Sequence, residues 1–429
     1  MKQRLRIIVT GLVGLYPIGG VAWDYLQYVI GLARLGHEVY YYEDSCCWPY
    51  HPLKKTTVPE GIYSAKFITQ FFQRYAPDLK ERWQYFHLHK ERFGMNQGRF
   101  NDVAKTADLF LNVSGACTIP DNLSSRCIKV FLDTDPGYNQ IVMSERPEWS
   151  QNVQRWCETV AAHDRYFTLA ENIHSHDCRI PKMGLSWQTT RVPIVLDVWE
   201  HILTKRLPES ASWTTVMTWN PFKGKLIYQN MEYKGKGEEF EKIFELPQRT
   251  GLPFTLAVGG GKAPMDRLLN HGWHIIEGET VSVTPDQYQD FISGSPGEFS
   301  PAKHVYVAMR SGWFSSRSAC YLAAGKPVVT QDTAFSSILP VGKGLLAYTN
   351  LEEAVTALRD VEANYAQHAK AARMIAEEHF HSDIVLNHLI EQALNDPGSP
   401  DHGSSISQTA RTNDNHIVKT EEHHAQTYA

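Results

Sequence analysis

The stretch from Arg310 to Asp332 constrains the fold of this chain more than any other segment. It reads RSGWFSSRSACYLAAGKPVVTQD, and small residues precede a short apolar segment that is predicted to be a helix from about Arg317 to Ala324. Gly325 can adopt the positive φ that ends a helix, and Pro327 prevents the helix from continuing. The β-branched residues 328–330 then predict a strand. Such a turn–helix–strand unit is typical of an α/β domain.

The start of this predicted helix is also a candidate anion site. Its first N–H groups have no partner within the helix, and they lie at the positive end of the helix dipole. Arg317 in the first turn opposes that dipole unless an anion, such as a diphosphate, compensates its charge. We therefore predict that the first turn binds a diphosphate through backbone N–H groups, hydroxyls and the guanidinium. The predicted ligands are Ser315, Ser316, Arg317 and Ser318.

The same stretch resembles the donor-nucleotide helix of GT-B glycosyltransferases, especially those of the family 4 type. The usual pattern there is E-G-F-G, four residues, then E-A-M-A-A-G-x-P-V-V. Phe314 and the run from Ala323 to Val329 match it, whereas Gly312 and Cys320 stand where the two glutamates are usual. In the family, one glutamate holds the donor ribose and the other lies near the sugar. Any other turn–helix–strand unit of an α/β domain is the alternative for this stretch taken alone.

The N-terminal residues predict a Rossmann-like opening. A buried strand at Arg6–Val9 is followed by the turn GLVGLYPIGG, a helix over residues 21–35 and a strand over residues 38–42. The turn lacks the dinucleotide fingerprint G-x-G-x-x-G. It resembles the P-x-G-G…L-x-x-x-G-H-E-V start of the family 4 type, in which Gly19 and Gly20 would let the backbone approach the donor closely. A tight turn with no ligand is the alternative.

Two aspartates follow the strand predicted over residues 127–133. Asp133 and Asp135, in the sequence D-T-D-P-G, stand at the carboxyl end of that strand, where open α/β sheets place their ligands. We predict that one of them is the acid/base or orienting carboxylate of catalysis. Two alternatives remain. The aspartates could cap their own turn beside Pro136 and Gly137, or form the metal-binding Asp-x-Asp of the GT-A fold.

A lysine–glycine dipeptide opens a predicted helix in the second half of the chain. Lys234-Gly235 matches the K-G of the family, and the lysine there typically contacts the donor phosphate. The arginine that usually precedes it is absent, and Trp219-Asn220 stands in its place. The resemblance therefore implies Lys234 as a donor-binding residue.

The order of predicted strands and helices divides the chain into two Rossmann-like domains of a GT-B, α/β fold. Further expectations are a helical segment over residues 80–93 and strands over residues 191–195 and 304–308. The predicted ranges are an N-terminal acceptor-side domain 1–197, a linker 198–212, a C-terminal donor-nucleotide domain 213–381, a terminal helix 382–394 that packs back on the first domain, and a disordered tail 395–429.

Composition favours one cellular compartment for the protein and excludes some classes of binding partner. A net charge of −5 provides no basic footprint for nucleic acid. Seven cysteines are an odd number without metal-ligand spacing, which favours a reduced, cytoplasmic protein. The basic N-terminus precedes an apolar run, but Gly11, Gly14 and Pro17 interrupt it, so we do not expect a signal peptide. No stretch approaches the roughly 20 apolar residues that span a bilayer.

The resemblance implies transfer of a sugar from a nucleoside diphosphate sugar to an acceptor hydroxyl. Neither a metal nor a cofactor beyond this co-substrate is expected, because helix N–H groups, Lys234 and Arg317 would stabilise the leaving diphosphate. The acceptor stays open among a glycan, a lipid and a small molecule, and a lipid would bring the protein to a membrane surface. Two alternatives remain: a nucleotide-sugar epimerase of the same fold, and a catalytically weak partner subunit that binds a sugar nucleotide.

Overall fold

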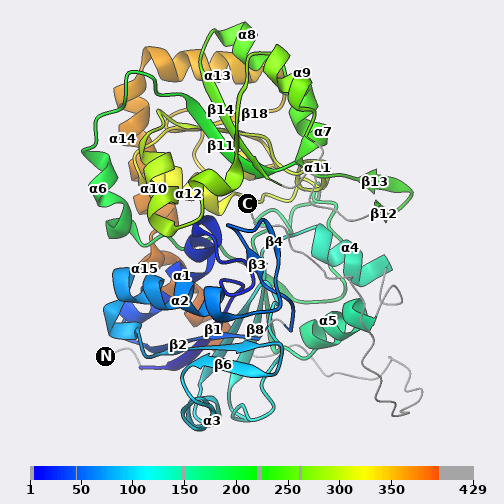
Figure 1. The fold of residues 1–429 in the computed structure, drawn as a ribbon. Coiled ribbons are helices and arrows are strands. Elements are labelled where there is room, and N and C mark those ends of the chain that lie inside the picture. Colours follow the sequence, from blue (N-terminus) through cyan, green and yellow to red (C-terminus); the bar gives the residue numbers. More distant parts are fainter. Residues whose placement is uncertain (1–3, 45, 146–150, 220–224, 260–262, 396–429) are drawn as a thin grey trace.

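Two α/β halves, each built on its own sheet, make up the fold (Figure 1). The computed structural model describes residues 4–44, 46–145, 151–219, 225–259 and 263–395. The predicted tail from 395 onward lies outside the described residues, except for Asn395. The two large sheets confirm the predicted α/β class.

The N-terminal half contains an eight-stranded sheet of order β10-β9-β8-β7-β1-β2-β5-β6. Neighbouring strands run parallel except for β5 and β6, which are antiparallel. The central strand β1 is buried at Ile7, Ile8 and Val9, as expected for a parallel strand covered on both faces. The strands are β1 Arg6–Thr10, β2 Glu38–Glu43, β5 Trp83–His87, β6 Glu91–Gly94, β7 Leu109–Val113, β8 Ile128–Asp133, β9 Arg165–Thr168 and β10 Trp187–Thr189.

Helices and one small hairpin complete this half. The hairpin pairs β3 (Tyr50–His51) with β4 (Thr56–Thr57). The helices are α1 Gly19–Arg34, α2 Ile62–Tyr75, α3 Gln97–Lys105, α4 Tyr138–Glu145 and α5 Gln151–Ala161, to which the chain later adds α15 Ser382–Asn395.

The C-terminal half contains a six-stranded parallel sheet of order β15-β14-β11-β16-β17-β18. A short hairpin of β12 (Leu226–Tyr228) and β13 (Met231–Tyr233) projects from it. The strands of the sheet are β11 Trp213–Thr218, β14 Phe254–Gly259, β15 His274–Glu277, β16 Glu298–Ser300, β17 Val328–Gln331 and β18 Leu345–Tyr348. The helices are α7 Lys236–Phe240, α8 Leu246–Thr250, α9 Met265–Asn270, α10 Pro285–Ser293, α11 His304–Ala308, α12 Ser316–Ala323, α13 Leu351–Ala363 and α14 Tyr365–Ile375.

Three local predictions are wrong, each because tertiary context or turn chemistry overrides the local pattern. Residues 80–93 form the hairpin β5–β6 rather than a helix, since Leu88 and His89 both adopt positive φ in its turn. Residues 304–308 are the helix α11, although their β-branched and aromatic residues favour a strand. The last strand of the first sheet is β10, and residues 191–195 contribute only an isolated bridge from Ile194 to His381.

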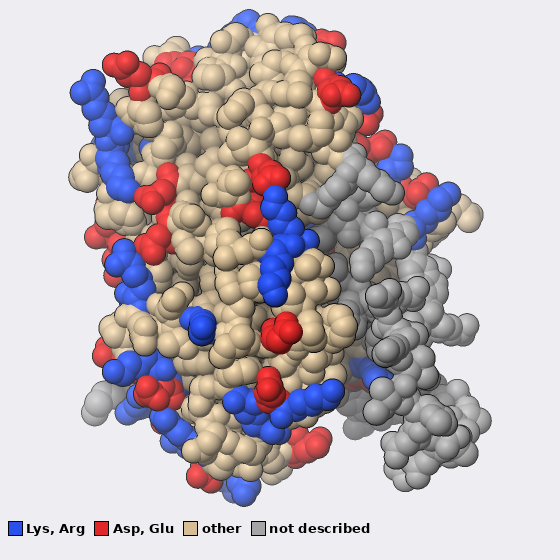
Figure 2. All heavy atoms as spheres, in the orientation of Figure 1, with Lys and Arg blue, Asp and Glu red and all other residues tan. Residues whose placement is uncertain are grey.

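Charged side chains of both signs are mixed over the face of the molecule drawn in Figure 2. Basic and acidic residues lie close to one another over both halves of that face. Within the described residues, no helix is long and apolar enough to cross a membrane.

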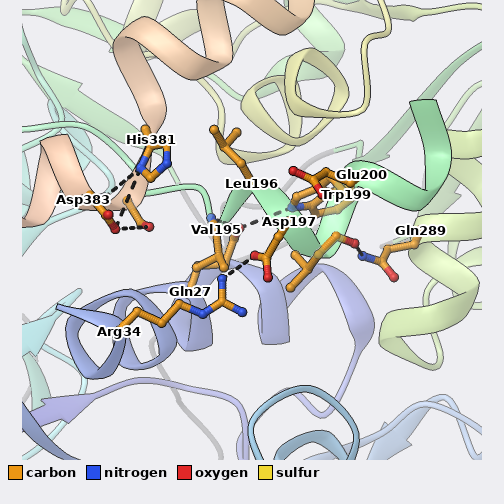
Figure 3. A network of polar contacts seen from close by, with 12 residues as sticks. Gln27, Arg34, Val195, Leu196, Asp197, Trp199, Glu200, Gln289, His381 and Asp383 are labelled. Atoms are coloured by element: carbon orange, nitrogen blue, oxygen red, sulfur yellow. Dashed lines mark hydrogen bonds and ion pairs between the residues drawn. The ribbon is translucent and has the colours of Figure 1, made fainter. Parts of the chain in front are cut away.

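The chain crosses between the two halves in a segment that is held by a network of polar contacts (Figure 3). Gln27 of α1 accepts hydrogen bonds from the Val195 backbone N–H (3.0 Å) and the Trp199 indole (3.4 Å). On the return passage, the Ser382 N–H donates to the carbonyl oxygen of Ile194 (2.9 Å). The short helix α6 (Glu200–Leu203) lies in the segment that leads into β11. The Gln27 side chain therefore holds the first crossing to the N-terminal half, and a backbone hydrogen bond holds the second.

Helix α1 lies between the two halves. It contacts α10 and α12 of the C-terminal half and α15, the last helix of the described chain. At Gly31 a side chain would meet Leu386 and Ser382 of α15 at 2.6 and 2.9 Å, so the missing side chain permits this close packing. Helix α1 therefore packs against elements of both halves.

Candidate functional site

A small cavity lies between the two halves at the carboxyl ends of β7 and β8. Its volume is about 120 Å³. The N-terminal half lines it with α1 and with residues that follow β7 and β8, and the C-terminal half lines it with residues of α7, α10, α11 and α12. Open α/β sheets bind ligands at this edge. We call this space the central cavity.

The beginning of α12 faces the central cavity. Ser315 is the N-cap residue with extended backbone, and its side chain makes no capping hydrogen bond within the helix. Ser315 and Ser316 both line the cavity. The first N–H groups of the helix are unpaired within it, so this end attracts an anion. Ser318 is different, because its hydroxyl is buried away from the cavity and finds no hydrogen-bond partner among the described residues.

The Arg317 guanidinium is engaged by the C-terminal sheet. It forms a buried ion pair with Glu298 of β16, donates to the Val216 carbonyl oxygen (2.6 Å) and donates to the Ser300 hydroxyl (2.7 Å). The compensating anion that we predicted is thus a carboxylate of the protein itself. Arg317 also lines the central cavity. Its contact with a phosphate therefore stays a prediction, and it would have to form beside these three bonds.

Two neighbouring lysines differ in their relation to the cavity. Lys234, the predicted ligand, has a side chain that is 48% exposed, and it pairs with Glu238 at 2.8 Å. Lys236 lines the central cavity and is only 6% exposed. It starts α7, and the next residue, Gly237, lies so close to Trp219 that a side chain would meet the indole nitrogen at 2.6 Å. The fold therefore presents the second K-G dipeptide of K-G-K-G to the cavity.

Lys236 is an unusual buried cation. Within the part of the chain that the structure describes, its ammonium has no hydrogen-bond or ion-pair partner. Burial lowers the pKa of Lys236 well below its usual value, and the charge of Arg317 lowers it further, whereas Glu298 opposes the change. An anion in the cavity would compensate this charge. The repeated lysine–glycine pattern was the available signal, but only the fold distinguishes its two copies.

Asp133 is enclosed by hydrogen-bond donors of the N-terminal half. It is fully buried and does not line the cavity. Its oxygens accept from the side chains of Asn139 (2.6 Å), Gln140 (2.7 Å) and Thr168 (2.8 Å), and from the Asp135 N–H (3.2 Å). Burial raises the pKa of Asp133 to about 6, and the side-chain hydrogen bonds counteract that rise. This arrangement matches the alternative in which the carboxylate organises its own turn.

Asp135 does line the central cavity, and it joins the two halves. Its carboxylate pairs with the Lys303 ammonium at 2.7 Å and accepts a hydrogen bond from the Tyr306 hydroxyl. Lys303 precedes α11 and Tyr306 lies within it. The predicted catalytic position is thus present in the site, as part of a contact between the halves.

Asp24 is a cavity residue that the sequence analysis missed. It lies on α1, one turn after Gly20, and both residues line the cavity. The Ser316 side chain at the start of α12 interacts favourably with its carboxylate. Burial raises the pKa of Asp24 to about 6, against the effects of the Ser316 side chain and the Arg317 charge. A carboxylate inside a helix carries no local signal that it faces a ligand site.

The two predicted glycines have separate surroundings. Gly20 lines the cavity beside the Tyr288 ring. Gly19 instead contacts the C-terminal half: its N–H donates to the Ser282 carbonyl oxygen (2.6 Å), and a side chain would meet the Thr284 carbonyl oxygen at 2.3 Å. Gly19 therefore allows the two halves to approach closely.

The two positions where the resembling family has glutamates do not offer side chains to the cavity. Gly312 has φ of +73°, and a side chain there would meet the Asn172 backbone nitrogen at 2.6 Å. Cys320 is buried, with its sulfur 3.9 Å from the Gln27 amide nitrogen. All seven cysteines are free thiols. In the described ranges, no group of three or more His, Cys, Asp or Glu residues is arranged to hold a metal ion.

No protein-family model and no curated protein sequence matches the chain. Solved structures do match it. One is an α-glucosyltransferase in complex with UDP and a 13-mer DNA, with 11% identity, a TM-score of 0.54, and coverage of 91% of this chain and 100% of that one. Another is Anabaena HepE in complex with UDP and glucose, with 13% identity, a TM-score of 0.53, and coverage of 91% and 100%. The two sheets and these likenesses together show that the chain has the GT-B fold of glycosyltransferases.

Proposed function

We propose that this protein is a glycosyltransferase that moves a sugar from a nucleoside diphosphate sugar to an acceptor hydroxyl. Two solved structures of similar fold contain UDP, one together with DNA and the other with glucose. In this chain the donor diphosphate would bind at the central cavity, between the start of α12 and Lys236. The donor nucleotide, the sugar and the acceptor are to be identified by experiment.

The observation that carries the proposal is the buried Lys236 side chain beside the N-terminus of α12, whose nitrogen has no hydrogen-bond or ion-pair partner among the described residues. Both line one cavity, and both favour an anion there. A buried ammonium is costly unless it is paired, so a fold that retains one at a cavity gains from a ligand that supplies the counter-charge. A diphosphate has the charge and the acceptor oxygens that this arrangement requires.

The reaction needs a stabilised leaving group and a route for one proton. The bond between the sugar C1 and the phosphate oxygen breaks, and the diphosphate leaves with the electron pair. Lys236 and the N–H groups of α12 would stabilise that charge without a metal. The acceptor oxygen forms the new bond to C1 and loses its proton. Asp24 and Asp135 are the carboxylates that line the cavity, so they are the candidates for orienting the acceptor or accepting this proton.

The size of the central cavity implies that the halves separate to admit a donor. Its 120 Å³ is below the roughly 300–1,000 Å³ typical of ligand pockets. Contacts hold the halves together, including the Asp135–Lys303 pair at the cavity and, elsewhere, the hydrogen bond from Tyr50 to Glu279 (2.7 Å). We therefore interpret this arrangement as a closed form, in which the two halves leave room for little more than a phosphate group between them.

Binding measurements on two lysine variants test the proposal. Calorimetric titration with UDP, GDP and ADP, and with their sugar derivatives, should identify a donor class. Lys236→Met should then weaken binding of that nucleoside diphosphate by about ten- to a hundredfold, because a charge-assisted hydrogen bond to phosphate is lost. Binding of the bare nucleoside should change much less. Lys234→Met is the matched control, since it removes the same charge two residues away, outside the cavity.

The reverse result, with loss of binding in Lys234→Met alone, would support Lys234 as the phosphate ligand, as the family resemblance implies. It would also show that Lys236 does not bind the donor. No binding of any member of the panel would overturn the proposed donor class. Once a donor is known, its slow hydrolysis without acceptor distinguishes an enzyme from a weak partner subunit. Recovery of the donor with an inverted sugar centre would instead identify an epimerase.

A further inference from the structure

A second hollow lies at the opposite end of α12, away from the central cavity. We call it the hinge groove: it is lined by residues of the segment 202–207, of the turn 324–326 and of α14 over residues 365–377. Its volume is about 700 Å³, which lies in the range of pockets for small organic ligands. Helices α6 and α14 lie on the same side of the C-terminal half (Figure 1).

The hinge groove is basic although the protein as a whole is acidic. The net charge of the chain is −5, yet the groove is lined by five basic side chains and one acidic side chain. Lys370 and Arg206 have no ion-pair partner among the described residues. The charged residues of the lining are Lys205, Arg206, Lys326, Lys370, Arg373 and Glu377.

Lys326 is the most informative of these cations. It is only 4% exposed, and no hydrogen bond or ion pair to its ammonium occurs within the residues that the structure covers. Burial lowers the pKa of Lys326 to about 8. The end of α12 does not require this charge, because Arg373 already donates to the Ala323 carbonyl oxygen at 2.8 Å. A buried, unpaired ammonium at the wall of a groove is stabilised when an anion occupies the groove.

We propose that the hinge groove binds a phosphate-bearing organic ligand, with Lys326, Lys370 and Arg206 as its phosphate ligands. Leu203, Met374 and Tyr365 supply apolar surface beside these charges. That surface suits an organic group attached to the phosphate better than a bare inorganic ion. A sugar phosphate, a nucleotide and the headgroup of an anionic lipid all present this chemistry. The site is separate from the central cavity, and the inference does not depend on the proposed donor.

The position of the groove links it to the junction between the halves. Residues 202–207 belong to the segment that leads into the C-terminal half, whereas Lys326 and Lys370 belong to that half itself. Arg373 pairs with Glu377 at 2.7 Å and reaches Glu200 of α6 at 3.6 Å. A phosphate held by both Arg206 and Lys326 would therefore tie the connecting segment to the C-terminal half.

Titration with pyrophosphate, together with hydrogen exchange, tests the site in the whole protein. We expect pyrophosphate to protect residues 324–326 and 365–377 from exchange. Lys326→Met should weaken that protection and the corresponding calorimetric binding by about ten- to a hundredfold. Lys343→Met removes an exposed lysine of the same half outside the groove and should behave as the wild type. Lys236→Met should remove only pyrophosphate binding at the central cavity.

Two further experiments, a second groove variant and a vesicle-binding assay, complete the test. Lys370→Met changes an exposed groove lysine and keeps the test valid even if the Lys326 variant does not fold. Sedimentation with phosphatidylglycerol vesicles, compared with phosphatidylcholine vesicles, distinguishes a lipid headgroup from a soluble phosphate as the ligand. Binding that the groove variants lose indicates a lipid headgroup, and pyrophosphate binding without sedimentation indicates a soluble phosphate. The proposal is overturned if pyrophosphate leaves residues 324–326 and 365–377 unprotected, or if both groove variants retain full protection.

Discussion

Two kinds of buried charge surround the central cavity, and they differ in how completely the protein pairs them. Asp133 accepts four hydrogen bonds from its own half, and the Arg317 guanidinium bonds Glu298, Val216 and Ser300. Lys236, by contrast, has no partner in the described chain, and Asp24 reaches only across the cavity to Ser316. The first two charges are paired within their own halves, although Arg317 also lines the cavity, whereas the last two line the cavity with fewer partners.

This difference separates structural charges from charges that are available to a ligand. A buried charge that already has its full set of partners cannot contact a ligand without losing them. A cavity charge that lacks partners gains from a ligand of opposite sign. We therefore propose that Asp133 and Arg317 serve mainly the stability of each half, and that Lys236 and Asp24 serve the ligand site.

The largest expected effect tests whether Arg317 stabilises the fold. Arg317→Met would leave Glu298 buried without its partner, which should cost about 3–5 kcal/mol of stability. The measurement is the midpoint of urea unfolding. The double variant Arg317→Met/Glu298→Met should recover much of the loss, because a pair of apolar side chains replaces the ion pair. A stable single variant that loses only nucleoside diphosphate binding would contradict this and would restore the predicted phosphate contact.

The sequence predicts the local structure around the site better than the direction of its side chains. The end of α12 follows from Gly325 and Pro327, which act through backbone conformation alone. The roles of Asp133 and Asp135 could not be separated in the same way, because residues two apart on an extended segment lie on the same side. Only the donors at 139, 140 and 168, brought together by the fold, show which carboxylate is enclosed.

The choice between Lys234 and Lys236 shows the same limit. Both lysines precede a glycine, so the resemblance to the family motif fits either one. The decisive contact is that of Gly237 with Trp219, whose indole fills the space that a side chain at position 237 would occupy. Trp219 directly follows β11, and no local pattern relates it to α7. Long-range packing therefore decides which lysine reaches the cavity.

A second test addresses the enclosed carboxylate. Asp133→Asn keeps the shape of the side chain but replaces one acceptor oxygen with an NH₂ group. That NH₂ group would face the hydrogen-bond donors that surround the carboxylate in the wild type. We expect a loss of about 2–3 kcal/mol in stability, as for a broken hydrogen bond to a charged group. Turnover per folded molecule should be nearly unchanged. A variant that unfolds at the wild-type urea concentration but turns over much more slowly would return Asp133 to the catalytic role first predicted for it.

The smallest expected effect concerns the pH dependence of donor binding through Asp24. Its carboxylate interacts favourably with the Ser316 side chain, one of the residues expected to meet the donor diphosphate. The pKa of Asp24 is raised to about 6, so the carboxylate is mostly neutral at pH 5 and mostly charged at pH 7. The groups that act on it electrostatically are Arg317 and Cys320 of α12 and Tyr288 of α10.

A charged Asp24 should repel the diphosphate and compete with it for Ser316. Affinity for an intact nucleoside diphosphate sugar, whose own charge is constant in this range, should therefore fall as the pH rises from 5 to 7. A screened like charge costs about 1 kcal/mol, so the fall should be roughly fivefold. Asp24→Asn should show a smaller fall over the same range, and any remaining fall would come from Lys236, whose pKa is lowered in the same cavity. An equal slope in both proteins would show that Asp24 does not meet the donor, and it would leave Lys236 as the cavity charge that senses the diphosphate.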